Sequence, residues 1–294
     1  MKTTAIILAL ITCLHAEDDT DFTTEPGLDW QRVYALPSAV YTFANGTATL
    51  ACTAPSLEVA QVYGLARAAL LAPTEYTTAV VSADVVAVGG VRTFASVITR
   101  VGTPAGLGTS RGYSLTIIPT ESGKFQIHRL DGEIPTQIGS TTYAALLPGH
   151  SYRLILASVG STHTGRIYDT IDLATPLAEL TAFDATYASG RSGIVASTDS
   201  LVNISATFDN FLAWDGKPAP LTIVPSDIYP TAILLKTEAR RAIATNLEST
   251  GDLLLSPWSP APPDLKVHTG TELHTHHLPF APQQFYRRRL LGAP

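Results

Sequence analysis

The sequence is poor in the features that most often identify a function. Of its 294 residues only 15% are charged, two are cysteines and one is methionine. Cys52 is the one cysteine outside the first 16 residues, so a chain cleaved after Ala16 can form no intramolecular disulfide. The formal net charge is −6, and basic residues cluster only at 287–289. Both observations argue against nucleic acid as a partner.

Long apolar runs are also missing, except for residues 5–14 behind the positively charged Lys2. This run is too short to span a bilayer, and the small Ala16 before an acidic stretch is typical of a cleaved secretory signal. A lipoprotein signal with Cys13 as the lipidated residue is the alternative, but Thr12 is bulkier than the residue that usually precedes such a cysteine. We therefore expect a secreted protein, extracellular or periplasmic, without an integral membrane segment after cleavage.

Helical periodicity is nearly absent, whereas short alternating strands bounded by turn residues recur along the chain. Three predicted β-hairpins are residues 80–101, 113–130 and 152–172. Residues 57–71 are the exception, since their spacing fits either a short amphipathic helix or an irregular pair of strands. The regular spacing of short strands predicts an all-β sandwich.

Composition changes after Trp214, and this predicts a division of the chain. Residues 216–220 contain two prolines and read as a linker. We expect a signal peptide at 1–16, a large β domain at 17–215, this linker, and a small β module at 221–294.

Several short motifs follow one another in a characteristic order. Asp21-Phe22 opens the predicted domain and residues 208–211 (Phe-Asp-Asn-Phe) close it, with a turn at 43–47 and the segments 148–154 and 190–195 between them. In this order the motifs resemble the concanavalin A-like or laminin-G-like jelly-roll domain of secreted bacterial proteins. The resemblance covers about residues 18–214.

The resemblance implies a fold more clearly than a function. It implies an all-β concanavalin A-like jelly-roll sandwich, with its first and last strands side by side, followed by a small C-terminal β-sandwich module. The C-terminal part resembles, more faintly, a β module that ends some secreted bacterial surface proteins. Because this fold serves sugar binding, adhesion and polysaccharide cleavage alike, the function must be sought in particular residues.

Catalytic carboxylates are not evident. Jelly rolls that cleave β-glucans carry a Glu-x-Asp-x-x-Glu strand, and this spacing does not occur in the sequence. The catalytic candidates are instead Gln126 and His128, which alternation places on one face of a strand. Their Gln-Ile-His motif resembles that of jelly-roll alginate lyases, which implies that Gln neutralises a uronate carboxylate and His acts as the base. The Arg-rich and Tyr-Lys strands of those lyases have no counterpart here.

Sugar binding needs an aromatic platform beside polar side chains, because pyranose rings have apolar faces and hydroxylated rims. Candidates for such a site are the aromatic residues Trp30, Tyr113 and Tyr187, with Arg111 and Arg191 as polar neighbours. The alternative for each aromatic residue is a place in the core.

Acidic loop residues suggest one metal. Asp169, Asp172 and Asp184 could give a calcium ion hard oxygen ligands at the rim of a sandwich, although the Asp-x-Asp-x-Asp loop spacing is missing. We expect no cofactor, with calcium as the alternative.

Together these patterns predict a secreted, non-catalytic protein that binds a polysaccharide or cell-surface glycan, or mediates adhesion, through its jelly roll. Two alternatives stay open. The first is a polysaccharide lyase or glycoside hydrolase, and the second is a structural envelope component without a small ligand.

Overall fold

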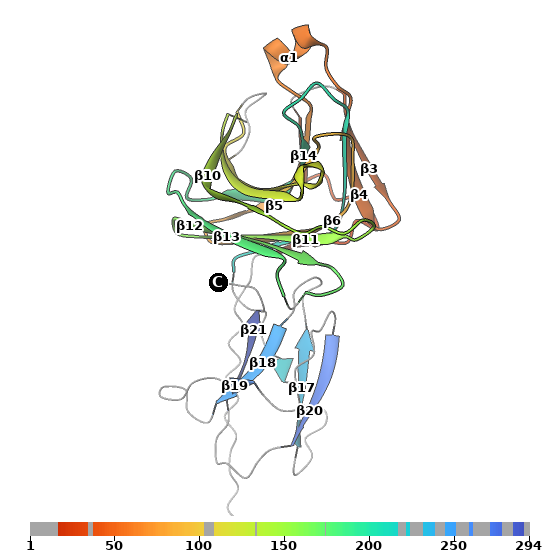
Figure 1. The fold of residues 1–294 in the computed structure, drawn as a ribbon. Helices are drawn as coiled ribbons and strands as arrows, with labels where there is room; N and C mark the ends of the chain where they lie inside the picture. Colours follow the sequence, from red (N-terminus) through yellow and green to blue (C-terminus); the bar gives the residue numbers. More distant parts are fainter. Residues whose placement is uncertain are drawn as a thin grey trace, which may run out of the picture.

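The fold is given by a computed structural model (Figure 1). It describes residues 17–34, 38–102, 109–132, 134–173 and 175–216, and beyond them the strands at 222–223, 232–238, 245–250, 259–260, 271–277 and 285–290.

Two antiparallel sheets make up the part of the chain up to residue 216 (Figure 1). Sheet A has the strand order β13 (Ala178–Phe183), β12 (Thr162–Asp169), β11 (Tyr152–Val159), β6 (Ala79–Gly89), β15 (Ile204–Trp214), β4 (Thr47–Cys52) and β3 (Ala39–Ala44), and β1 (Glu17–Thr20) also pairs with β15. Sheet B has the order β10 (Ile134–Tyr143), β9 (Lys124–Asp131), β8 (Gly112–Ile118), β7 (Phe94–Val101), β14 (Gly190–Ser197), β5 (Arg67–Tyr76) and β2 (Gln31–Tyr34).

The core lies between the two sheets, and alternation along the strands fills it. On β8, Tyr113, Leu115 and Ile117 are at most 1% exposed and point toward sheet A, where Leu154 and Leu156 of β11 meet them. The residues between them on β8 therefore face outward, away from sheet A. The all-β, concanavalin A-like jelly-roll sandwich that the sequence predicts is confirmed.

Most of the predicted strand pairings are confirmed, and one predicted hairpin is not. The first and last strands do lie side by side, because Thr20 pairs with Phe211. The hairpins at 113–130 and 152–172 are confirmed as β8 with β9 and β11 with β12. The prediction of a hairpin at 80–101 was wrong, because β6 belongs to sheet A and β7 to sheet B. Both strands are apolar on two faces, and such a pattern does not distinguish a hairpin from an arch between sheets.

The segment at 57–71 begins as the predicted short helix and then enters a single strand, so the alternative of an irregular pair of strands was wrong. Its first half is the helix α1 (Leu57–Tyr63), which Ser56 caps by accepting a hydrogen bond from the Val59 N–H at 3.3 Å. Gly64 ends the helix with a φ of 85°, a conformation that favours glycine, and the chain then enters β5. A 3₁₀ turn, η1 (Pro119–Glu121), joins β8 to β9.

The described strands after residue 221 pair only with one another, in two antiparallel three-stranded sheets. One has the order β16 (Thr222–Ile223), β17 (Ala232–Glu238), β20 (Thr271–His277), and the other β19 (Ser259–Pro260), β18 (Thr245–Thr250), β21 (Phe285–Leu290). The exact domain boundaries and the sandwich form of this part stay predictions. Within the described residues, no helix has the length and hydropathy that crossing a membrane requires.

Candidate functional site

The outward face of sheet B is hollowed into a groove of about 570 Å³. The strands of this sheet curve around the hollow, and α1 stands at its open end (Figure 1). Ser114, Thr116 and His128 line the groove, and they alternate with the core residues of β8 and β9. The same curvature that packs sheet B on the core therefore produces the groove.

The floor of the groove is aliphatic. Seven side chains from five strands of sheet B form one apolar cluster there, namely Val33, Ala69, Leu71, Ile98, Val101, Leu130 and Val195. None of these seven is aromatic, and the one aromatic side chain in the described lining is Phe94, at the start of β7.

One wall of the groove is polar but uncharged. Strand register places Ser114 opposite His128, and Ser96 opposite Thr116. The Ser96 and Thr116 hydroxyls lie 2.9 Å apart and share a hydrogen bond. These hydroxyls and the imidazole form a row that can both donate and accept hydrogen bonds.

His128 and Ser114, unlike Ser96 and Thr116, make no side-chain hydrogen bond to another described residue. Burial lowers the pKa of His128 to about 4, and the positive charge of Lys124 adds to this effect. The imidazole is therefore neutral at neutral pH, with one donor and one acceptor nitrogen for a ligand.

Gln126 lies on the same face of β9, as alternation predicts, but its amide is already engaged. Its Nε2 donates to Gln137 Oε1 at 2.6 Å and to Thr141 Oγ1 at 2.7 Å, and the residue is 6% exposed. The described lining of the groove includes no tyrosine or lysine beside His128. This placement does not support the lyase roles expected for Gln126 and His128.

Carboxylates are scarce in the groove as well. Asp199 supplies the one carboxylate of its described lining. Arg92 binds that carboxylate from its Nε at 2.7 Å and so holds the pKa of Asp199 below its usual range. A second carboxyl group, as glycoside hydrolysis requires, is missing from the described lining.

Tyr113 lies in the core, on the opposite side of sheet B from the groove. Its hydroxyl donates to Asp184 Oδ1 at 2.7 Å and accepts from the Tyr187 N–H at 3.0 Å. Its ring lies 3.9 Å from that of His163, and burial raises the pKa of Tyr113 to about 12. A fully buried ring cannot present a face to a sugar, so this placement does not support Tyr113 as a ligand platform.

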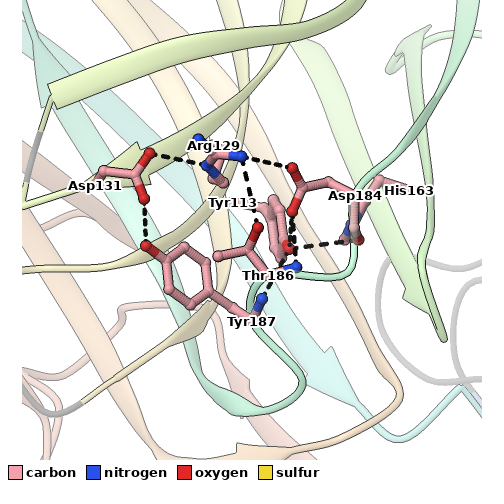
Figure 2. A network of polar contacts seen from close by, with 7 residues as sticks. All are labelled: Tyr113, Arg129, Asp131, His163, Asp184, Thr186 and Tyr187. Atoms are coloured by element: carbon pink, nitrogen blue, oxygen red, sulfur yellow. Dashed lines mark hydrogen bonds and ion pairs between the residues drawn. The ribbon is translucent and has the colours of Figure 1, made fainter.

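Tyr187 belongs to the same polar network, which ties the β13–β14 connection to sheet B (Figure 2). Arg129 binds Asp131 from Nε and Asp184 from Nη1, each at 2.8 Å, and the Tyr187 hydroxyl donates to Asp131. Burial opposes the ionisation of Asp184, but the hydrogen bonds that it accepts hold its pKa well below the usual range. Both carboxylates are therefore charged and share one guanidinium, that of Arg129, which fits a structural role.

Trp30 and Arg191 are brought together elsewhere, in a second hollow of about 630 Å³ beside β2. Trp30 packs edge-on against Phe211 with 5.2 Å between ring centroids, and Arg191 Nη1 donates to Gln31 Oε1 at 3.4 Å. Arg111 does not line this hollow and lies exposed before β8. The five predicted sugar-binding residues thus do not form one site.

The three predicted calcium ligands do not converge either. The Asp184 N–H donates to the Ser161 carbonyl, beside the start of β12, whereas Asp169 ends that eight-residue strand. At the usual rise of a strand, this separates them by about 20 Å. Asp169 pairs with His150, and the Asp172 N–H donates to the Asp169 carbonyl at 3.0 Å. Within the described part of the chain, no group of three His, Cys, Asp or Glu side chains could hold a metal ion.

Sequence reasoning missed the row of hydroxyls in the groove. The signal was present in residues 113–117, where Ser114 and Thr116 alternate with large apolar residues. Small polar residues on a strand usually face solvent, and only the curvature of sheet B shows that these two line a hollow.

No protein-family model matches this chain, and no curated protein sequence does. Solved structures of similar fold include the carbohydrate-binding module CBM66 from Bacillus subtilis, with 12% identity over 61% of this chain and 92% of that chain and a TM-score of 0.44. A prokaryotic β-1,3-1,4-glucanase (lichenase) derived from a mouse hindgut metagenome has 10% identity over 68% and 98%, with a TM-score of 0.47. Lectin II from Ulex europaeus has 10% identity over 68% and 98%, with a TM-score of 0.46. Such distant likenesses assign neither ligand nor activity to this chain.

Proposed function

We propose that this is a secreted, non-catalytic protein whose groove on sheet B binds an extended, uncharged glycan. The observation that carries this proposal is the pairing of an aliphatic floor with a neutral row of hydroxyls and one imidazole. A pyranose chain has the complementary surface, since its C–H faces are apolar and its rims carry hydroxyl groups. The described lining holds one carboxylate, Asp199, which Arg92 binds, and one guanidinium, that of Arg67. Because these charges are few and of opposite sign, a neutral glycan fits better than a polyanion or a polycation.

The lining also favours binding over cleavage. Hydrolysis of a glycosidic bond ordinarily needs two carboxyl groups about 5 to 10 Å apart, and the described lining has only Asp199. Elimination from a uronate needs a base and a group that neutralises the carboxylate. His128 could be the base, but the Gln126 amide donates within the protein instead.

A second ligand class is favoured by the mouth of the groove. Val62 is 72% exposed and Ile134 is 69% exposed, and both line it. Exposed aliphatic side chains that continue an aliphatic floor suit an acyl chain or an apolar peptide segment. This second candidate differs from the first in its ligand but uses the same site.

The test is binding of residues 17–294 to a panel of neutral glycans, acidic glycans and acyl-chain probes, measured by calorimetry with and without calcium. We expect a neutral glycan to bind, and Thr116→Val and His128→Ala each to weaken it by about tenfold, since each removes one hydrogen-bonding group. The matched control is Thr181→Val, because Thr181 is exposed on β13 of the other sheet. The affinity of Thr181→Val for the neutral glycan should equal that of the parent protein.

The same mixtures are assayed for unsaturated sugars and for new reducing ends. Product formation that His128→Ala abolishes would establish the enzymatic alternative in place of ours. If only the acyl-chain probes bind, the ligand of the groove belongs to the second class and is not a glycan. If no member of the panel binds, the alternative of a structural envelope component without a small ligand is favoured.

A further inference from the structure

The outward face of sheet A, turned away from sheet B, carries apolar side chains where a solvated face would be polar. Strand register places Trp214 of β15 beside Val80 of β6, and Val80 beside Ala157 of β11. Leu212 and Ile155 occupy the next row in the same way, with Ser82 between them. Since the neighbouring residues along these strands point into the core, this second apolar layer lies outside it.

This layer is buried. Trp214 is 1% exposed, Leu212 0%, Val80 2% and Ile155 7%. An ion pair lies at its edge, in which Arg153 binds Asp84 through two hydrogen bonds of 2.7 Å, and these side chains are 5% and 7% exposed. A sheet face with such low exposure must be covered by other residues, because side chains on an open sheet remain accessible from one side.

The described elements up to residue 216 do not supply this cover. Their strands all belong to sheet A or sheet B, while α1 lines the groove of sheet B and η1 joins two of its strands. Of the described loops, Leu173 packs against the edge of the layer formed by Tyr168 and its neighbours. Leu173 alone is too small to cover a patch that includes a tryptophan and two rows of aliphatic residues.

Two ends of the described sandwich lie at this face. Glu17 pairs with Trp214, so the first described residue lies beside this layer. Gly216 lies there as well, because a Cβ at that position would be 3.5 Å from Val80 Cγ2. The leading residues 1–16 are expected to be removed, whereas residues 217–294 remain and carry the apolar stretch 221–224 (Leu-Thr-Ile-Val) just after the predicted linker.

We propose that residues 217–294 dock on the outward face of sheet A and bury the layer centred on Trp214 and Ile155. The two parts of the mature chain then form one body, joined through an apolar interface. The groove on sheet B faces the other way and stays open to its ligand. This inference is independent of the proposed function, because it concerns the opposite sheet.

The first test uses the intact mature chain. Hydroxyl-radical footprinting should oxidise Trp214 and Tyr168 at least tenfold more slowly than tryptophan and tyrosine that are open to water; Tyr143, which is 61% exposed, serves as the internal reference. Rapid oxidation of Trp214 in residues 17–294, with protection only when residues 1–16 are present, would overturn the proposal in favour of the leader.

The second test inserts a protease site between Pro218 and Ala219 and cleaves the folded protein there. We expect the two fragments to co-elute in gel filtration at micromolar concentration. Ile155→Glu should separate them, whereas Thr181→Glu, at an exposed position on the same sheet, should not. Fragments that separate without any substitution would contradict the proposal. So would a Trp214 that stays protected after separation, because the cover would then come from residues 17–216.

Discussion

The Gln126 amide nitrogen donates to the Gln137 amide oxygen at 2.6 Å and so joins β9 to β10. Gln137 in turn donates to Thr141 Oγ1 at 3.0 Å, which closes a small ring of polar contacts. His128, two residues further along the same face of β9, has no such partner among the described residues. Of the two residues singled out by their sequence motif, His128 is therefore the one that a ligand in the groove can meet.

The first prediction concerns the titration of His128. Because burial lowers its pKa to about 4, the folded protein binds this proton less readily than the unfolded chain, where histidine has a pKa of about 6.5. Its neutral form stabilises the fold fully above about pH 6.5, and this contribution is lost as the pH falls toward 4. Between pH 7 and pH 4, the parent should lose about 1 to 3 kcal/mol more stability than His128→Gln.

Denaturant unfolding of both proteins at several pH values checks this prediction. Burial lowers the pKa of His163 as well, but that residue is present in both proteins and its effect cancels. Parallel pH profiles for parent and variant would show that His128 is not desolvated in the groove.

The second prediction concerns Arg100, whose guanidinium is buried without a carboxylate. It donates to four backbone carbonyls, at 3.0 Å to Thr77, 2.7 Å to Gly160, 3.2 Å to Tyr187 and 3.0 Å to Ser158. Arg100→Met would leave these carbonyls without their donor, and we expect a loss of about 3 to 5 kcal/mol in unfolding free energy. Arg111→Met, at an exposed position, should change it by less than about 0.5 kcal/mol. Equal effects of the two substitutions in urea unfolding would refute this role.

The third prediction concerns Gly190, which lies against the backbone of Arg100. A Cβ at Gly190 would be 2.5 Å from the Arg100 carbonyl carbon, and the φ of Gly190 is 148°. Gly190→Ala should therefore destabilise the protein by about 2 to 4 kcal/mol. Gly149 has a φ of 79° but open space around it, so Gly149→Ala should cost only about 1 kcal/mol. Thermal unfolding of the two variants compares them, and a smaller loss at Gly190 would be inconsistent with the close approach.

The fourth prediction separates structure from binding at Tyr113. Tyr113→Phe removes the hydroxyl that bonds to Asp184 and Tyr187, and we expect a loss of about 1 to 3 kcal/mol in stability with unchanged affinity for the ligand of the groove. Tyr143→Phe, on a ring that is 61% exposed, should change neither quantity. If Tyr113→Phe lowers the affinity without lowering the stability, Tyr113 takes part in ligand binding and this prediction is wrong.

The sequence was sufficient for the fold class because alternation is a local property. Tyr113, Leu115 and Ile117 show period two without any knowledge of their partners, and so do many other segments. The arch between β6 and β7 could not be foreseen in the same way. A strand that is apolar on both faces does not reveal which sheet its neighbour joins, and the choice depends on contacts between distant segments.

The candidate site was predicted less well, for a related reason. His128 was identified from a motif, and the structure places it in the lining of the groove. Trp30 and Tyr113 were chosen by residue type alone, and whether an aromatic ring faces the core or the solvent depends on packing. The hydroxyl row of Ser96, Ser114 and Thr116 depends on the pairing and curvature of two neighbouring strands, β7 and β8, which no single segment encodes.

The central claim is that the groove of sheet B holds a ligand between its aliphatic floor and its neutral polar wall. The most direct measurement fills that groove with Ser114→Trp and compares glycan binding with the parent, using Thr181→Trp as the control. We predict that Ser114→Trp abolishes binding of the neutral glycan while its circular dichroism spectrum and thermal unfolding stay close to those of the parent. Undiminished binding by a folded Ser114→Trp protein would contradict the account and place the site elsewhere.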